Sequence, residues 1–159
     1  MEPEIKYKPI DLQFQNYISR SETVLLPHNW SVENEVDHIY SENTVTISKL
    51  FKINNIPVSI YGFKEDSKIT NNRNIEWVSP IIFLSAALIS NNPEISSLAI
   101  SILANYLTDL FRGNNNSPNV KISLYFENSK GEIKEASYSG PTSGLHKFKQ
   151  SIEEFSKIK

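Results

Sequence analysis

The chain has 159 residues, a formal net charge of −2 and no cysteine, with 39% hydrophobic and 21% charged residues. This composition is typical of a folded protein, and the length predicts a single domain over 1–159, with 1–78 and 79–159 as possible halves that share a core. Disulfides and thiolate metal sites are excluded, and because neither half is strongly basic we expect no binding of nucleic acid.

The apolar segments indicate where the protein resides. The stretch "MEPEIKYKPI" at residues 1–10 is polar and contains no signal-peptide core. The longest apolar run, "PIIFLSAALI", is only about half as long as a membrane span. We therefore expect a cytoplasmic protein that does not enter a membrane.

The first forty residues predict two short strands and a helix. Apolar and polar residues alternate over 10–14, and "TVLLP" (23–27) is a second apolar run, so both segments predict strands. Over 31–40, valine and isoleucine recur at helical spacing behind Ser31, whose hydroxyl suits an N-terminal cap. That pattern predicts a helix.

Segments 44–53 and 56–63 favour a β-hairpin. They flank Asn54 and Asn55, and asparagine tolerates the positive φ that a tight turn requires. The resulting register places apolar side chains from both segments on one face. A short helix within 44–53 is the alternative.

Two helices are expected next. Residues 64–74 are polar and aperiodic and predict a loop. A serine–proline pair at 79–80 suits a helix start, and the apolar run "PIIFLSAALIS" (80–90) then predicts a buried helix. A second start signal at 92–94 opens a helix whose wide apolar face extends to Gly113.

The last part of the chain predicts a hairpin followed by a helix. Residues 120–127 alternate cleanly, "NSKG" (128–131) is a turn, 132–139 is the return strand, and 145–155 carries an apolar stripe at helical spacing. We expect an α+β fold with an antiparallel sheet, helices on one face, and a C-terminal half ordered helix, helix, strand, strand, helix. The inward positions of these elements should be buried together: Ile102, Leu103, Tyr106, Leu124, Phe126, Phe148 and Ile152.

The loop "SGPTSGLHKF" (139–148) is the segment most similar to a ligand site. Gly140 and Gly144 would allow close approach of a phosphate, and the hydroxyls of Thr142 and Ser143 could contact it. The spacing does not match a P-loop, because leucine and histidine follow Gly144. A connector in which Thr142 or Ser143 caps the last helix is the favoured interpretation.

Two other places could carry chemistry. Glu35 and His38 have the i, i+3 spacing at which a carboxylate and an imidazole can share a metal ion, and the fold could add His28. No second such pair exists, so a solvated acidic helix is favoured and no cofactor is expected. Trp30 in "LPHNWS" is either an exposed anchor for a partner or, as we favour, a side chain tucked under its own loop.

Residues 80–158 resemble a known class of domain. "ISSLAISILANYLTDLFRG" (95–113) and "VKISLYFENSKGEIKEASYSGPTSGLHKFKQSIEEF" (120–155) are similar to small adaptor-type domains that accompany effector proteins in bacterial conflict and defence systems. The resemblance implies a non-enzymatic domain that couples proteins through homotypic or partner contacts. It lies in core and turn positions and therefore carries over no site residues.

These patterns favour a non-enzymatic interaction or adaptor module of a bacterial defence or effector system, with a protein partner or self-assembly. Two alternatives remain. One is a small metal- or nucleotide-dependent enzyme or ligand-binding domain that uses the histidines or the 139–148 loop. The other is an immunity or inhibitor protein that binds a basic partner with its acidic first half.

Overall fold

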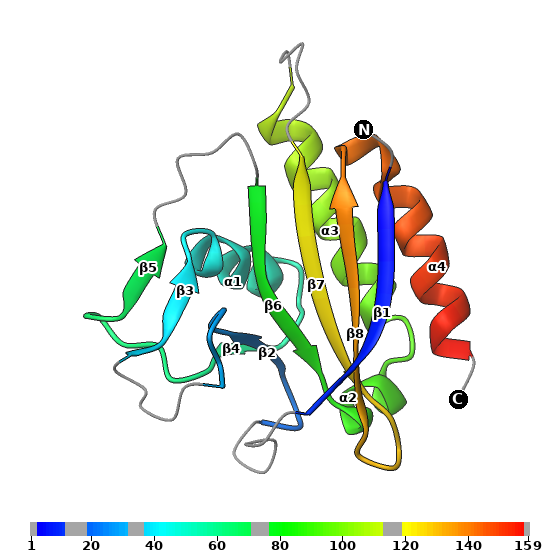
Figure 1. The fold of residues 1–159 in the computed structure, drawn as a ribbon, viewed down its shortest axis with the longest axis horizontal. Helices are drawn as coiled ribbons and strands as arrows, with labels where there is room; N and C mark the ends of the chain where they lie inside the picture. Colours follow the sequence, from blue (N-terminus) through cyan, green and yellow to red (C-terminus); the bar gives the residue numbers. More distant parts are fainter. Residues whose placement is uncertain (1–2, 12–18, 32–36, 71–76, 113–118, 158–159) are drawn as a thin grey trace.

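A computed structural model of the chain describes residues 3–11, 19–31, 37–70, 77–112 and 119–157 (Figure 1). The described strands and helices follow one another as β1 (Glu4–Ile10), β2 (Thr23–Leu26), β3 (Ile39–Ser41), α1 (Thr44–Ile53), β4 (Val58–Ile60), β5 (Lys68–Thr70), β6 (Trp77–Leu84), α2 (Ala86–Asn91), α3 (Ile95–Leu110), β7 (Val120–Glu127), β8 (Ile133–Gly140), the 3₁₀ turn η3 (Thr142–Gly144) and α4 (Leu145–Lys157). The fold class is therefore α+β.

The main sheet has six strands in the order β1-β8-β7-β6-β2-β4. Three neighbouring pairs are antiparallel, but β6 pairs with β7 and β2 pairs with β4 in parallel. The prediction of a purely antiparallel sheet is wrong. Parallel neighbours need a crossover, and α3 joins β6 to β7 while α1 lies between β2 and β4 in the chain.

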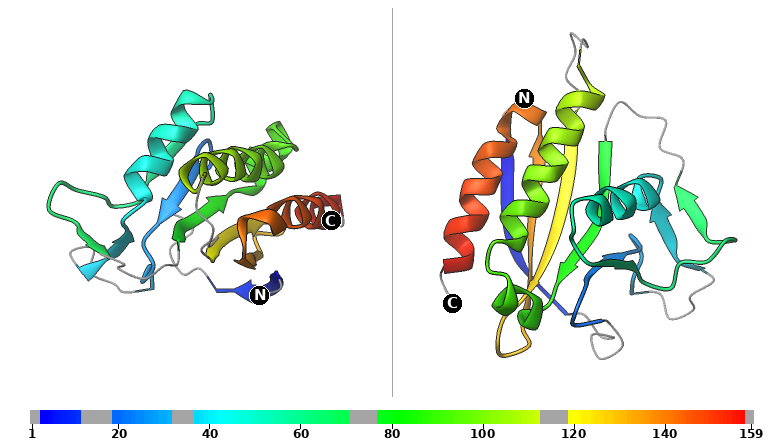
Figure 2. Two further views of the ribbon diagram at one scale, coloured as in Figure 1. Left: turned by 90° about the horizontal axis from the view of Figure 1, so that it is seen from above. Right: turned by 180° about the vertical axis from the view of Figure 1, so that it is seen from behind.

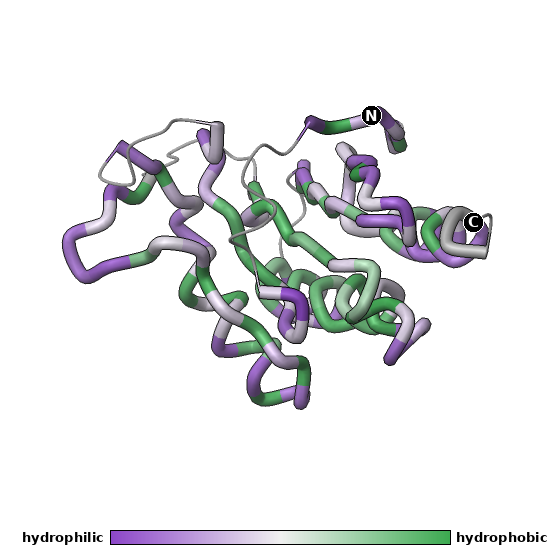
Figure 3. Tube along the Cα trace, turned by 90° about the horizontal axis from the view of Figure 1, so that it is seen from below, coloured by the Kyte–Doolittle hydropathy of each residue, from purple (hydrophilic) through white to green (hydrophobic). Residues whose placement is uncertain are grey.

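The helices lie on one face of this sheet, as expected (Figure 2). Hydrophobic residues concentrate in the central strands of the sheet and in the helices beside them (Figure 3), and the larger cluster of buried side chains joins these elements. Six of the seven residues expected in the core are buried, and Tyr106 is partly buried at its margin. The larger core cluster joins strands and helix α1 from residues before 78 with strands and helices from residues after it.

The opposite face of the sheet carries a smaller apolar cluster. It is centred on β2 and β6, where Phe83 and Leu26 are fully buried, and it includes Tyr125 of β7. Beside it, β3 and β5 form a separate two-stranded parallel sheet. Residues 68–70 were expected in a loop, so β5 is a correction, and it forms because β3 supplies a neighbouring strand.

Residues 44–53 form helix α1 rather than a hairpin strand. Ile47 and Phe51, one helical turn apart, are fully buried against the core. Asn54 then caps the helix, and Asn55 takes the positive φ of 63° that was expected of a hairpin turn. Left-handed asparagine suits a helix C-terminus as well as a hairpin, which is why the pattern was ambiguous.

Residues 77–84 form strand β6 rather than a helix. Ile82 and Leu84 face the helices while Ile81 and Phe83 join the opposite cluster, so the strand is buried on both sides. A continuous apolar run has no period that separates a buried strand from a buried helix. The serine–proline pair at 79–80 lies where the register shifts, and the helix start is at Ser85, whose hydroxyl accepts the N–H of Leu88 (3.1 Å).

The expected order of the C-terminal half, helix, helix, strand, strand, helix, is wrong at its start, because strand β6 precedes α2. Most of the other predictions are confirmed. Strand β2, helix α3, the hairpin of β7 and β8 and helix α4 match their expected segments. The strand expected over 10–14 is described only at its start, where Ile10 is the last residue of β1. Residues 12–14 lie outside the described residues. So do most of the residues of the helix expected over 31–40, but Ile39 belongs to strand β3.

Candidate functional site

The loop at 139–148 turns strand β8 into helix α4 through the short turn η3. The N–H of Gly144 donates to the carbonyl of Pro141 (3.1 Å), and the hydroxyl of Tyr138 donates to the same carbonyl. Tyr138 is buried, and its burial raises the pKa of the phenol, so the hydroxyl is a protonated donor at neutral pH. His146 follows one turn later, with Nδ1 2.9 Å from the carbonyl of Ser143.

The two glycines of this loop face other parts of the chain rather than an open cradle. A Cβ on Gly144 would lie 2.4 Å from the Tyr138 hydroxyl and 2.6 Å from Cγ of Pro3. A Cβ on Gly140 would lie 2.9 Å from Cα of Pro3. The side of each glycine toward which a Cβ would point is therefore filled by Tyr138 and by the residue that precedes β1. This geometry favours the interpretation of the loop as a connector between β8 and α4. Thr142 and Ser143 lie in the turn η3 itself.

Trp30 lies on the helix-free face of the sheet. Its indole N–H donates to the hydroxyl of Tyr125 (2.9 Å), and the two rings meet edge to face at 6.1 Å. The side chain is half-buried against the apolar cluster of that face. This position agrees with a tryptophan tucked against its own domain.

His28 and His38 lie in different surroundings. His38 is buried beside Tyr61, with ring centroids 6.1 Å apart, whereas His28 is exposed and bonds through its backbone N–H to Ile39. Glu35 lies outside the described residues. Within the described part of the chain, no three acidic or histidine side chains lie together as metal ligands would.

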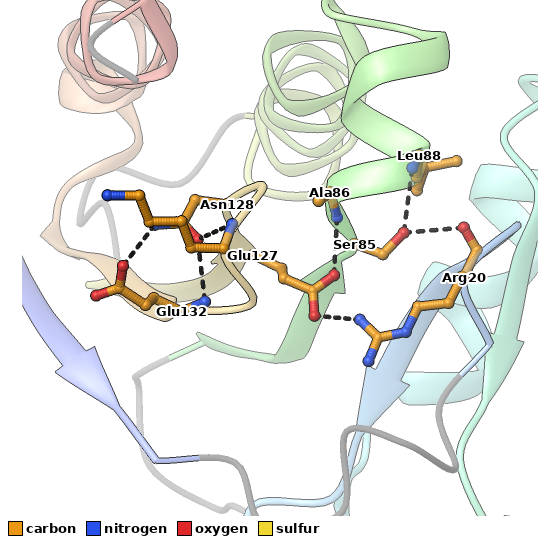
Figure 4. A network of polar contacts seen from close by, with 8 residues as sticks. Arg20, Ser85, Ala86, Leu88, Glu127, Asn128 and Glu132 are labelled. Atoms are coloured by element: carbon orange, nitrogen blue, oxygen red, sulfur yellow. Dashed lines mark hydrogen bonds and ion pairs between the residues drawn. The ribbon is translucent and has the colours of Figure 1, made fainter.

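A polar network that the sequence did not indicate lies where β6 and β7 end (Figure 4). Glu127, the last residue of β7, forms an ion pair with Arg20 and accepts the N–H of Ala86 (3.0 Å). Ser85 caps α2 and donates its hydroxyl to the carbonyl of Arg20 (2.9 Å). Glu127 is 8% exposed at its side chain, so this carboxylate is desolvated and held by two donors.

This network ties three segments that are distant in the chain. Arg20 precedes β2, Ser85 and Ala86 start α2, and Glu127 ends β7. Both oxygens of the carboxylate have a donor, one from the guanidinium and one from a helix N-terminus, where negative charge is favoured. The arrangement holds the end of the sheet together rather than presenting a reactive group.

The position of strand β1 is the second feature that the sequence did not indicate. Its backbone forms an edge of the described six-stranded sheet (Figure 1). The turn between β7 and β8 shows how the hydrogen bonds alternate. The N–H of Asn128 donates to the carbonyl of Glu132 (2.9 Å), so these two residues are a hydrogen-bonded pair. The register from Glu127 opposite Ile133 to Val120 opposite Gly140 has no shift. Even-numbered residues of β7 and β8 therefore bond each other, and odd-numbered residues of β8 bond β1.

That alternation determines which groups of β1 face outward. Odd-numbered residues of β8 lie opposite the even-numbered residues of β1, such as Lys6 opposite Ser137. The N–H and C=O groups of Ile5 and Tyr7 therefore point away from the sheet, as does the nitrogen of Pro9, which has no hydrogen to donate. Within the described residues, β8 is the one strand that pairs with β1.

The side chains of β1 divide between the two faces. Tyr7 hydrogen-bonds through its hydroxyl to Ser151 of α4, yet the residue remains 39% exposed. Lys6 and Lys8 lie on the helix-free face, where Lys6 pairs with Glu4 (3.0 Å) and Lys8 pairs with Glu135 (3.4 Å). The alternation of "EIKYKPI" with a late proline is the sequence signal that could have identified an edge strand.

No protein family matches the chain, and no curated protein or solved structure matches it significantly. Among the described helices, none is both long and apolar enough to cross a membrane.

Proposed function

We propose that the protein is a non-enzymatic interaction module that binds an extended protein segment along strand β1. The observation that carries the proposal is the place of β1 at the rim of a six-stranded sheet, where the N–H and C=O of Ile5 point away from β8. A strand added there would continue the sheet, a common mode of peptide recognition. A role in bacterial defence, which the resemblance of residues 80–158 implies, would be one setting for such a module.

The charged residues and the proline of β1 do not close this edge. Lysine and proline on an edge strand commonly prevent pairing with other strands. Here both lysines project from the face of the sheet and are offset by carboxylates of the same chain. Pro9 removes one donor near the end of the strand, and the N–H of Ile5 is unaffected by it.

Pairing along this edge would also bury apolar surface. Tyr7 and Ile5 lie on the side of α4, and Ile5 packs at the margin of the main core. An added strand would place its own side chains beside them.

The test is a proline placed at Ile5. Ile5→Pro removes an outward N–H and puts the ring in the path of an added strand, while the bonds from β1 to β8 are kept. Ile5→Val is the matched control, because it changes the side chain but keeps the N–H. Proteins bound to the tagged chain in its own cells are quantified, and the mass of the purified chain is measured by light scattering.

We expect the association to persist in Ile5→Val and to be lost in Ile5→Pro, with the two variants equally folded by circular dichroism and melting temperature. An association that survives Ile5→Pro in the folded variant would show that the partner does not bind this edge.

A further inference from the structure

We infer that β1 is an exchangeable strand, which leaves its place beside β8 and takes the same place in a second copy of the chain. Two copies then hold one another through their β1 strands. We call this place the seat of β1; it is formed by the edge of β8, the turn at 140–144 and helix α4. The inference goes beyond the proposed function and does not depend on it, because it concerns the side of β1 that pairs with β8.

The seat recognises alternate residues of the segment that it holds. A Cβ on Gly144 would lie 2.6 Å from Cγ of Pro3, so the absence of a side chain there leaves room for the proline ring. Two residues on, Ile5 packs at the margin of the main core, and Tyr7 hydrogen-bonds to the hydroxyl of Ser151. Backbone pairing combined with recognition of alternate side chains is how domains bind an extended peptide. The seat therefore holds β1 as it would hold a separate segment of the pattern Pro-x-Ile-x-Tyr.

The rest of the fold does not require β1 for its core. None of the seven residues of β1 is buried, and each is exposed or half-buried. The buried residues of both apolar clusters lie elsewhere in the chain. Without β1, the strands β8-β7-β6-β2-β4 still pair with one another. Because segments with few buried apolar contacts open at a lower free energy than the core, β1 can leave its seat while the remaining sheet stays folded.

A second copy offers the departed strand an identical seat. Every backbone bond to β8 and every side-chain contact that β1 loses in its own chain is made again in the other chain. Exchange of an identical element between protomers is a low-cost route to a dimer. The connection to β2 is long enough, because residues 11–22 separate the two strands and a segment of that length spans up to about 40 Å when extended. The balance between closed and exchanged forms therefore depends on the concentration of the chain.

The test uses the absence of cysteine from the natural chain, so that only introduced thiols form disulfides. Lys6 lies opposite Ser137, and Glu4 lies opposite Ser139. The Cα atoms of such hydrogen-bonded pairs are about 5.5 Å apart, within the range of a disulfide. A Lys6→Cys chain mixed with a Ser137→Cys chain should therefore become linked across an exchanged β1. Glu4→Cys mixed with Ser139→Cys should become linked in the same way.

The crossed mixtures are the matched controls. Lys6→Cys with Ser139→Cys, and Glu4→Cys with Ser137→Cys, use the same four thiols but set them two residues out of register, about 7–8 Å apart and beyond the reach of a disulfide. The mixtures are incubated at high concentration just below the melting temperature, oxidised and run on a non-reducing gel. We expect at least about fivefold more covalent dimer in the paired mixtures than in the crossed ones. Equal linkage in all four mixtures, or none in the paired ones, would overturn strand exchange.

A locked chain gives a second test. Lys6→Cys and Ser137→Cys combined in one chain and oxidised at low concentration tie β1 to its own β8. We expect the wild type and the reduced double variant to form dimers at high concentration by light scattering, and the locked chain to stay monomeric. A locked chain that dimerises as well as its reduced form would overturn the inference, as would a wild type that is monomeric throughout. The lock leaves the outward side of Ile5 unchanged, so another protein that binds there still binds the locked chain, and the two proposals are tested separately.

Discussion

Replacing Gly144 by alanine tests whether the 139–148 loop is closed by its own packing. The added Cβ would lie 2.4 Å from the Tyr138 hydroxyl and 2.6 Å from Cγ of Pro3, both far inside van der Waals contact. Backbone strain does not enter, because Gly144 is not among the glycines with positive φ. The effect therefore reports the contact itself.

The magnitude follows from two effects. Overpacking of a closed site costs about 1–3 kcal/mol. Displacing the Tyr138 hydroxyl from the carbonyl of Pro141 forfeits a further 0.5–1.5 kcal/mol or so. We expect Gly144→Ala to lower the free energy of unfolding by about 2–4 kcal/mol, measured by urea denaturation.

Two comparisons identify the cause. In a Tyr138→Phe background the nearest atom is gone, so the cost of Gly144→Ala should fall by about 1 kcal/mol in a double-mutant cycle. Gly131→Ala is the control for backbone strain alone, because its φ is +84° and no atom lies within 4 Å of the added Cβ, so it should cost about 1 kcal/mol. A Gly144→Ala cost below about 0.5 kcal/mol, or one unchanged by Tyr138→Phe, would refute the packing account.

A ligand titration completes the test. Phosphate and ATP are varied at constant ionic strength while the melting temperature is followed. A phosphate site requires stabilisation that grows with ligand concentration. Such stabilisation, abolished by Gly144→Val in a folded protein, would show that the loop is a binding site.

The core and the polar network give two further predictions. Ile152→Ala, at a fully buried position of α4, should lower the free energy of unfolding by about 2–5 kcal/mol in urea denaturation. Ile53→Ala, at a 77% exposed position, should lower it by less than about 0.5 kcal/mol. Equal effects would show that the apolar stripe of α4 is not part of the core. Glu127→Gln keeps an oxygen for the N–H of Ala86 but loses the ion pair with Arg20, so it should cost about 1–3 kcal/mol. Asp109→Asn, in the exposed pair with Arg112, should cost less than about 0.5 kcal/mol. A similar loss of stability in Glu127→Gln and Asp109→Asn would contradict a special role for the desolvated carboxylate of Glu127.

The sequence by itself determined the elements whose hydrophobic pattern has a clear period. Over 120–127 the alternation of Val120, Ile122 and Leu124 with polar residues requires a strand with one buried face, and these three side chains are fully buried. The stripe of Leu145, Phe148 and Ile152 likewise requires a helix, which is α4. In both cases the period alone separates strand from helix.

In segments without such a period, packing against neighbouring elements decides between strand and helix. The apolar run at 80–90 is compatible with a buried helix, and β6 forms because β2 and β7 pair with its two edges and apolar layers cover both its faces. The segment at 44–53 fits a strand or a helix, and the core places Ile47 and Phe51 on one helical face. Local propensity is similar for both outcomes, so the free energy of burial selects between them.

The candidate site depends still more on tertiary structure. A glycine-rich loop before a helix is the same in sequence whether it binds an anion or packs on its own chain, and Pro3, more than 130 residues away, decides the matter by filling the space beside Gly144. The ion pair of Arg20 with Glu127 joins residues 107 positions apart. A strand's own residues indicate which of its side chains face the core. That β1 lies at the edge of the described sheet follows only from its place among the other strands.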